Sequence, residues 1–324
     1  MVTLSRPGQN LGAGDENANF LTKWSGEVLA AFKNKNQFLE LTRSKDLQGA
    51  KSHVFPVVGI ASTSWHTPGD SLIRDGSYLN NIKSTEKEIF VDNVLVAPTM
   101  VYDLDEMKSH WEARREYTDA LSHALAQQAD EHILATILAA ARSAENITGQ
   151  TGSTTAIDIA TLTGAELAAA ALEAAQQFDT LNVPEEDRIF VVRPQGYYLL
   201  LDEKDLLDSD YNEGNGDFAK AKIWYVAGMR IVKTNNMPVT NLAGTPDVGA
   251  KNDPFGTGDG YNGDWRYVHA LAFHRSCVGT VRMKSLSLEG QSMLQYMGTF
   301  FLASYAMGHG VLRPEAAVEI GTYP

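Results

Sequence analysis

Residues 103–149 decide the fold and read DLDEMKSHWEARREYTDALSHALAQQADEHILATILAAARSAENITG. The stretch contains neither Pro nor Gly before Gly149, and it is rich in Ala, Leu, Glu, Gln and Arg, which favour helices. Asp103 followed by Glu106 is typical of a capping box, and Gly149 is a typical C-terminal stop. The stretch therefore predicts one helix of about forty residues and about 60 Å.

The apolar side chains of this predicted helix recur at every fourth position. They are Tyr117, Leu121, Leu125, Ala129, Ile133, Ile137 and Ala141. Each four-residue step exceeds a full turn by about 40°, so the stripe winds around the helix and meets different neighbours along its length. A period of four drifts away from the roughly 3.5-residue period of a coiled coil. Two interpretations remain: a core helix of a large domain, or a strut that spans an elongated subunit.

The composition of the chain limits its class. A length of 324 residues predicts two lobes, and the 44% apolar and 21% charged content is usual for a soluble globular protein. The sequence has no apolar run long enough to span a bilayer and no signal peptide, so we expect a cytoplasmic protein without a membrane partner. The single cysteine, Cys277, excludes a disulfide framework. The net charge of −13 argues against a non-specific nucleic-acid binder.

The segment before the long helix combines predicted strands with a long connection. The strands cover His53–Ile60 and Glu86–Tyr102, the second as one strand or as two in succession. The connection Ala61–Thr85 carries turn signals and is long for a compact domain, yet it contains large apolar side chains. We therefore expect a projecting hairpin whose apolar residues contact another subunit. The expected contact residues are Trp65, His66, Ile73, Tyr78 and Leu79.

Mixed elements are predicted in the rest of the chain, which indicates an α+β protein. Before the hairpin we expect a helix over Phe20–Lys33 and a strand over Phe38–Ser44. After the long helix we expect a polar linker over Gly149–Ala156, followed by a helix that begins with a capping box of Thr163 and Glu166 and ends at Phe178. The remaining expected elements are strands over Arg188–Val192, Met229–Thr234, Tyr267–His274 and Val278–Lys284, a helix over Pro194–Leu201, a loop over Leu242–Asp264, and strands between Gln291 and Ile320.

Short motifs give no support for catalysis. Gly258–Gly263 matches GxGxxG, but a strand rather than a helix is expected to follow, so we interpret it as a surface loop. Ser84–Lys87 matches SxxK within a predicted strand, where the serine and lysine cannot meet. The eight histidines do not cluster. We interpret the acidic run Asp202–Asp217 as a solvated surface and Cys277 as a thiol packed in the protein interior. We therefore assign no catalytic residue, no cofactor and no metal site.

Several short segments resemble the major capsid proteins of short-tailed podophages of the Autographiviridae type. They are Phe55–Gly59, Pro68–Leu72, Val101–Asp103, Arg115–Thr118, Phe273–Ser276, Val278–Val281, Tyr305–Gly310 and Arg313–Ala317. They occur in the order of the family and cover most of the chain from about residue 20, whereas residues 202–264 depart from it. The resemblance implies the tailed-phage capsid fold. It implies an N-terminal arm (1–50), an extended loop (51–102), a spine helix of the peripheral domain (103–150), an axial domain (151–290) and strands that return to the peripheral domain (291–324).

The same resemblance implies a structural protein of the virion, not an enzyme. Proteins of this family form icosahedral shells from hexamers and pentamers of one chain around a scaffolding protein, with a portal at one vertex, and enclose double-stranded DNA without recognising its sequence. An encapsulin-type compartment is the alternative within the same architecture, and a cytoplasmic enzyme is the alternative from another class. The segment Tyr305–Ala317 favours the phage protein over both.

Overall fold

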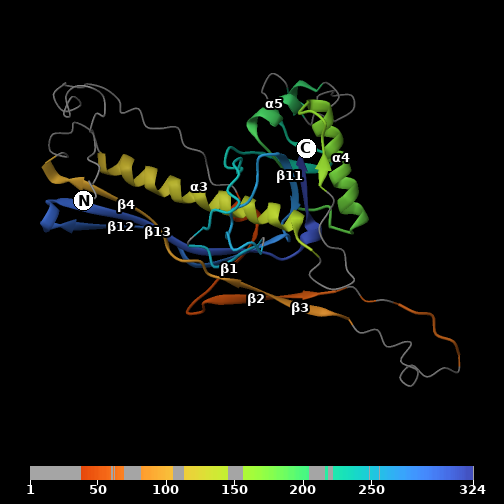
Figure 1. The fold of residues 1–324 in the computed structure, drawn as a ribbon, viewed down its shortest axis with the longest axis horizontal. Helices are drawn as coiled ribbons and strands as arrows, with labels where there is room; N and C mark the ends of the chain where they lie inside the picture. The colour runs from red at the N-terminus through yellow and green to blue at the C-terminus, as the bar shows by residue number, and fades with distance from the viewer. Residues whose placement is uncertain are drawn as a thin grey trace.

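The computed structural model describes residues 38–59, 61, 63–68, 82–104, 113–144, 156–203, 216–217, 222–247, 249–254 and 256–323. They form a four-stranded sheet, a six-stranded sheet, one long helix that packs against both, and a separate hairpin that extends to one side (Figure 1). This mixture confirms the predicted α+β class. Among these residues, none of the helices is both long enough and apolar enough to cross a membrane.

The four-stranded sheet has the order β1-β12-β13-β4. Its strands are β1 (Arg43–Asp46), β12 (Val278–Met293), β13 (Gly298–Val311) and β4 (Leu95–Tyr102). β1 runs parallel to β12, and the other pairs are antiparallel. The prediction that the strand from Val278 ends at Lys284 is wrong, because register shifts between Arg282 and Ser287 let the pairing with β13 continue to Met293.

The long helix α3 spans Ala113–Arg142 and lies along the four-stranded sheet (Figure 1). Asp103 and Leu104 are also helical, whereas residues 105–112 are outside the described part. The predicted end at Gly149 is wrong. Ser143 closes the helix, because its amide donates to the carbonyl of Ala140 at 3.1 Å and its hydroxyl donates to that of Ala139 at 2.6 Å.

The six-stranded sheet has the order β5-β14-β11-β6-β10-β9. Its strands are β5 (Ile157–Asp158), β14 (Ala317–Gly321), β11 (Val268–His274), β6 (Arg188–Val192), β10 (Met229–Lys233) and β9 (Tyr225–Val226). All five residues of β6 are buried. Ile189 and Val191 belong to the core shared with α3, whereas Phe190 and Val192 belong to the core shared with the helix α4 (Gly164–Thr180). Burial on both faces explains why β6 is apolar without alternation.

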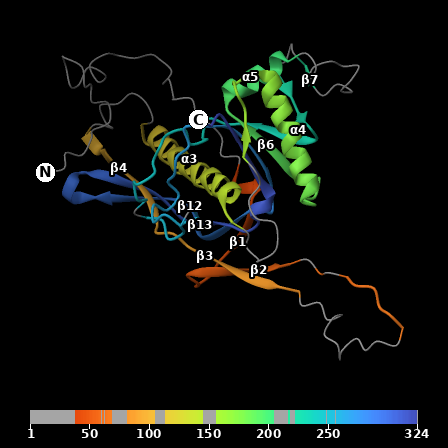
Figure 2. The same cartoon turned by 45° about the vertical axis from the view of Figure 1, so that its right-hand side comes forward.

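Helices α4 and α5 (Pro194–Asp202) cover the face of this sheet that points away from α3 (Figure 2). The expected cap at Thr163 is confirmed, because its hydroxyl accepts from the amide of Glu166 at 3.3 Å. The Glu166 carboxylate does not complete a capping box; it accepts from the amide of Thr161 at 2.7 Å. Pro194 occupies the first turn of α5, as predicted.

The separate hairpin pairs β2 (Ser52–Val58) with β3 (Ser84–Phe90) in antiparallel register, and it leaves the body below the four-stranded sheet (Figures 1 and 2). A further short pair joins β7 (Gly216–Asp217) to β8 (Lys222–Ile223). The predicted strand over Phe38–Ser44 is wrong at its start, because a 3-10 turn covers Leu39–Leu41 before β1. The helix expected over Phe20–Lys33, most of the linker before Ala156 and most of the acidic run lie outside the described residues.

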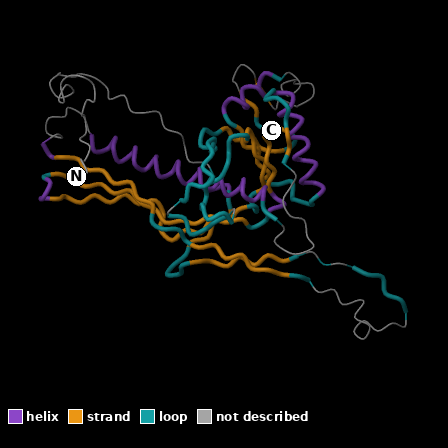
Figure 3. Tube along the Cα trace, viewed as in Figure 1, coloured by secondary structure: helices purple, strands orange, loops and turns teal. Residues whose placement is uncertain are grey.

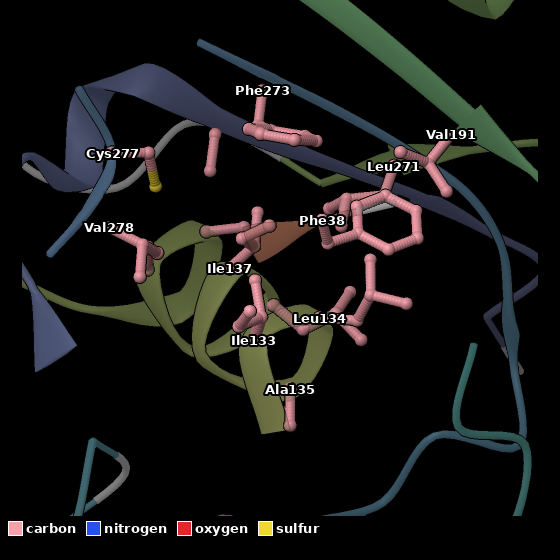
Figure 4. Packing of buried hydrophobic residues seen from close by; sticks show 14 of the residues in the cluster. Phe38, Ile133, Leu134, Ala135, Ile137, Val191, Leu271, Phe273, Cys277 and Val278 are labelled. Carbon is pink, nitrogen blue, oxygen red and sulfur yellow. The ribbon is translucent and has the colours of Figure 1, made fainter. Parts of the chain in front are cut away.

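The apolar stripe of α3 contacts both sheets. Leu125 and Ala129 pack against Ala303, Tyr305 and Met307 of β13. One turn later, Ile133 and Ile137 belong to a cluster with Phe38 and with strands of the six-stranded sheet, as Figure 4 shows for Val191, Leu271 and Phe273. The stripe therefore contacts different neighbours along the helix. Both interpretations apply: the part before Asp130 lies along the four-stranded sheet like a strut, whereas residues 133–141 are all buried, as in a core helix.

Candidate assembly surfaces and their structural support

The β2–β3 hairpin presents apolar side chains to solvent. Trp65, in the connection that follows β2, is 98% exposed. Val58 at the end of β2 is 59% exposed, and Ile82 shortly before β3 is 49% exposed. The root of the hairpin is fixed to the body because Phe55 and Ile89 pack with residues of the β12–β13 region. The expected contact residues Trp65 and His66 are both exposed. Ile73, Tyr78 and Leu79 lie outside the described residues.

A second exposed surface lies at the tip of the β12–β13 hairpin. A 3-10 turn over Leu294–Tyr296 joins the strands, and Met297 adopts a left-handed conformation before β13. Leu294 is 92% exposed and Met297 is 75% exposed. The contact residues predicted from the sequence did not include this tip. The signal that could have found it is the run MLQYM at 293–297, which places apolar residues directly before Gly298, where a turn is expected to be polar.

A third exposed surface lies at the edge of the six-stranded sheet. The edge strand β9 and the residue before it expose the large side chains of Trp224 and Tyr225. Nearby, the Lys233 ammonium lies over the rings of Tyr197 and Tyr198, 4.8 and 4.9 Å from their centroids. A cation held over two aromatic rings stabilises the packing of α5 on β10.

The connection between β3 and β4 is tied to the irregular segment 242–264, which Figure 3 shows as loops beside α3. Asn252 binds the backbone of Phe90 as a neighbouring strand would, because its side-chain oxygen accepts from the Phe90 amide at 3.0 Å and its nitrogen donates to the carbonyl at 2.7 Å. Asp92 accepts from the Tyr261 hydroxyl at 2.6 Å and from the amide of Lys251 at 2.6 Å. These contacts hold the root of the hairpin at a fixed position.

Burial sets the charge states in this junction. Burial raises the pKa of Asp92, and the hydrogen bond from Tyr261 partly offsets that effect. Burial and the nearby Asp92 carboxylate raise the pKa of Tyr261 well above its usual value, so the phenol keeps its hydrogen and donates it. The Tyr261 ring stacks on the His132 ring of α3, with a centroid separation of 4.6 Å. Burial lowers the pKa of His132, and Asp247 opposes that shift.

The first described residues of the chain are anchored to α3 through a buried carboxylate. Phe38 is fully buried, and its amide donates to Asp130 of α3 at 3.3 Å. The other oxygen of Asp130 accepts from the side chain of Asn236 at 3.0 Å. Asp130 therefore joins the N-terminal segment, the long helix and the residues after β10. The sequence offered no signal for this contact, since the three residues are far apart in the chain.

A salt bridge fixes the C-terminal end of α3 to the six-stranded sheet. Arg142 donates from Nε to Glu319 of β14 at 2.7 Å and from Nη2 to the second oxygen of the same carboxylate at 2.5 Å. Glu319 is almost fully buried, and the Arg142 guanidinium lies 5.2 Å from the centre of the Trp265 ring. This two-point geometry sets the direction in which α3 meets the sheet.

The weak sequence motifs lie where their chemistry is not possible. Gly258 and Gly260 have positive φ angles in the loop, and the element that follows the motif is the strand β11. Ser84–Lys87 lies within β3, so its serine and lysine are not on one helical turn. Cys277 is buried in the turn before β12, and burial raises the pKa of its thiol. Within the described ranges, no three His, Cys, Asp or Glu side chains form a group suited to a metal ion.

Comparison with known proteins agrees with this architecture. The profile of the Gp10A-like family, described as major capsid protein, matches residues 54–321. The chain is 33% identical to the major capsid protein of Escherichia phage T7, over 94% of this chain and 92% of that protein. It is 31% identical to that of Enterobacteria phage T3, over 97% and 94%. In the capsid structure of the cyanophage P-SCSP1u, a chain with 34% identity superposes with a TM-score of 0.81, over 99% of both chains. The resemblance read from the sequence is thereby confirmed: this chain belongs to the Gp10A-like family of major capsid proteins.

Proposed function

We propose that this phage capsid protein builds its shell through the β2–β3 hairpin, which reaches over a neighbouring copy of the same chain. The observation that carries the proposal is Trp65, which is 98% exposed on a segment whose root is fixed to the body. Burial of such a side chain against a neighbour would contribute roughly 2 kcal/mol per contact. A closed shell repeats every contact many times, so modest contacts add up to a stable assembly.

The same proposal includes the domain arrangement of the family. The hairpin would be the extended loop, α3 with the four-stranded sheet the peripheral domain, and the six-stranded sheet with α4 and α5 the axial domain. The boundaries at residues 51–102, 103–150, 151–290 and 291–324 stay predictions. The exposed edge at Trp224 and Tyr225 supports a contact surface on the axial domain. The bidentate Arg142–Glu319 salt bridge supports a rigid connection between these two proposed domains.

The proposed partners of the chain are those that its resemblance to phage capsid proteins implies. The chain would form hexamers and pentamers around a scaffolding protein in the host cytoplasm, with a portal at one vertex, and would then enclose double-stranded DNA. A net charge of −13 supports a wall that does not retain DNA by non-specific attraction.

Negative-stain electron microscopy tests this proposal directly. The full chain is expressed with and without a scaffolding protein, and both samples are imaged after size-exclusion chromatography. Uniform icosahedral particles in the presence of the scaffold are the expected result. Monomers or dimers under every condition would contradict it.

A further inference from the structure

A small cavity lies where α3, β13 and the segment 242–264 meet. Its volume is about 30 Å³, and its lining includes Asp92, His132, Asp247, Tyr305 and His309. Two polar atoms of this lining are buried and have no hydrogen-bond partner within the described part of the chain: the Tyr305 hydroxyl and Nε2 of His309. Buried polar atoms are nearly always paired, with protein or with ordered water.

The hydrogen bonds around His309 determine which ring nitrogen carries the hydrogen. The Thr42 hydroxyl donates to the carbonyl of Leu39 at 3.2 Å, so it has no hydrogen left for Thr280, which lies 3.2 Å away. Thr280 therefore donates to Thr42 and accepts from Nδ1 of His309 at 3.0 Å. This assignment leaves Nε2 of His309 as an acceptor without a donor.

We propose that one ordered water molecule occupies this cavity, accepts the hydrogen of the Tyr305 hydroxyl and donates one of its own to Nε2 of His309. A water requires at least about 10–15 Å³ and two to four polar partners, so the cavity has room for a water and is too small for an organic ligand. The second hydrogen of the water has acceptors in the same lining, the carboxylates of Asp92 and Asp247. Burial lowers the pKa of His309 to about 3, which keeps the ring neutral and able to accept.

A monovalent cation is the competing occupant, because two carboxylates line the cavity. A sodium ion supplies no acceptor for the Tyr305 hydrogen. It could take the lone pair of Nε2 of His309, but hard cations prefer oxygen ligands to an imidazole nitrogen. Water satisfies both, and the hydrogen-bond requirements therefore favour water.

A structure of the assembled full-length protein, at a resolution that shows buried waters, tests the proposal. A density peak within about 2.6–3.2 Å of both the Tyr305 hydroxyl and Nε2 of His309 is expected. An empty cavity, or a direct hydrogen bond between these two side chains, would overturn the proposal.

The sign of a stability change gives an independent test. If the water is present, Tyr305→Phe removes a hydrogen bond and lowers the Tm of the full chain by a few degrees. Without the water, the substitution removes an unpaired buried hydroxyl, so an unchanged or raised Tm overturns the proposal. Tyr197→Phe is the matched control, because its hydroxyl accepts from the amide of Ile223 at 2.9 Å and its loss must lower the Tm.

Exchange of sodium for tetramethylammonium at constant ionic strength distinguishes the two occupants. A Tm of the wild-type chain that does not change supports water. A Tm that falls in tetramethylammonium overturns the water assignment in favour of a bound cation, because the large ion cannot enter a cavity of about 30 Å³.

Discussion

The hydroxyl of Tyr261 donates to the carboxylate of Asp92 at 2.6 Å, although the two residues are 169 positions apart. Asp92 lies between β3 and β4, where the projecting hairpin joins the body, and Tyr261 lies in the irregular segment that packs on α3. Both residues are therefore part of the support of the proposed assembly surface.

Tyr261→Phe is expected to destabilise the subunit by about 1–3 kcal/mol. The substitution removes the hydrogen bond to Asp92 and leaves the amide of His309, which donates to the hydroxyl at 2.9 Å, without its acceptor. The aromatic ring that stacks on His132 is retained, so the subunit should still fold. Urea unfolding of the unassembled subunit measures the change. Tyr296→Phe, on the exposed hairpin tip, is the control, and an equal loss in both variants would contradict the prediction.

Gly308→Ala is expected to be among the most damaging single substitutions in the chain. A β-carbon at this position would lie 1.9 Å from the carbonyl oxygen of Phe90, and backbone on that side cannot yield easily. We expect a loss of about 3 kcal/mol or more, seen as a lower urea midpoint or as insoluble protein. Gly249→Ala is the matched control, because a β-carbon there meets only Asp247 at 4.0 Å. Similar urea midpoints for the two variants would refute the steric argument.

Acid is expected to destabilise the subunit through His309. Burial, together with the nearby His132, lowers the pKa of His309 in the folded state to about 3, below the usual value of about 6.5. Between these two pH values the unfolded chain binds the proton and the folded chain does not, so stability falls as the pH falls. The expected loss is about 1.4 kcal/mol for each pH unit below about 6.5. The raised pKa of Asp92 acts in the opposite direction, since the folded state then holds a proton more tightly than the unfolded state.

His309→Asn isolates this contribution, because the amide nitrogen of Asn can replace Nδ1 as the donor to Thr280. Urea midpoints from pH 7.5 to 5.0 should fall less steeply for this variant than for the wild type. His66→Asn is the matched control, because it makes the same substitution at an exposed side chain. If His309→Asn keeps the wild-type slope, His309 is not the source of the acid sensitivity.

Arg142→Met is expected to destabilise the subunit by roughly 3 kcal/mol or more, because the buried Glu319 carboxylate loses its bidentate partner. Arg142→Met combined with Glu319→Gln removes the uncompensated charge and should recover part of the loss. The two single variants and the double variant form a thermodynamic cycle measured by urea unfolding. Strictly additive changes would contradict a coupling between the two residues.

The sequence was sufficient to predict those helices and strands whose ends are set by residues close together in the chain. β6, α4 and α5 begin within a residue of their predicted positions, because apolar runs, an N-terminal cap at Thr163 and Pro194 set those positions. The end of α3 could not be predicted, since Ser143 closes the helix in a stretch without Gly or Pro. The junction at Asp92, Asn252 and Tyr261 could not be predicted either, because pairing across about 160 positions leaves no local pattern.

The central claim is that the shell assembles through the β2–β3 hairpin, and substitutions of Trp65 test it most directly. Trp65→Asp places a charge at a side chain that is 98% exposed and belongs to none of the buried clusters. The subunit should therefore keep the circular dichroism spectrum and urea midpoint of the wild type. Trp65→Phe keeps an apolar aromatic ring and is the matched control. Each chain is expressed with the scaffolding protein and imaged by negative-stain electron microscopy. Shells from the wild type and Trp65→Phe, with folded but unassembled Trp65→Asp subunits, are predicted, whereas normal shells from Trp65→Asp would contradict the account.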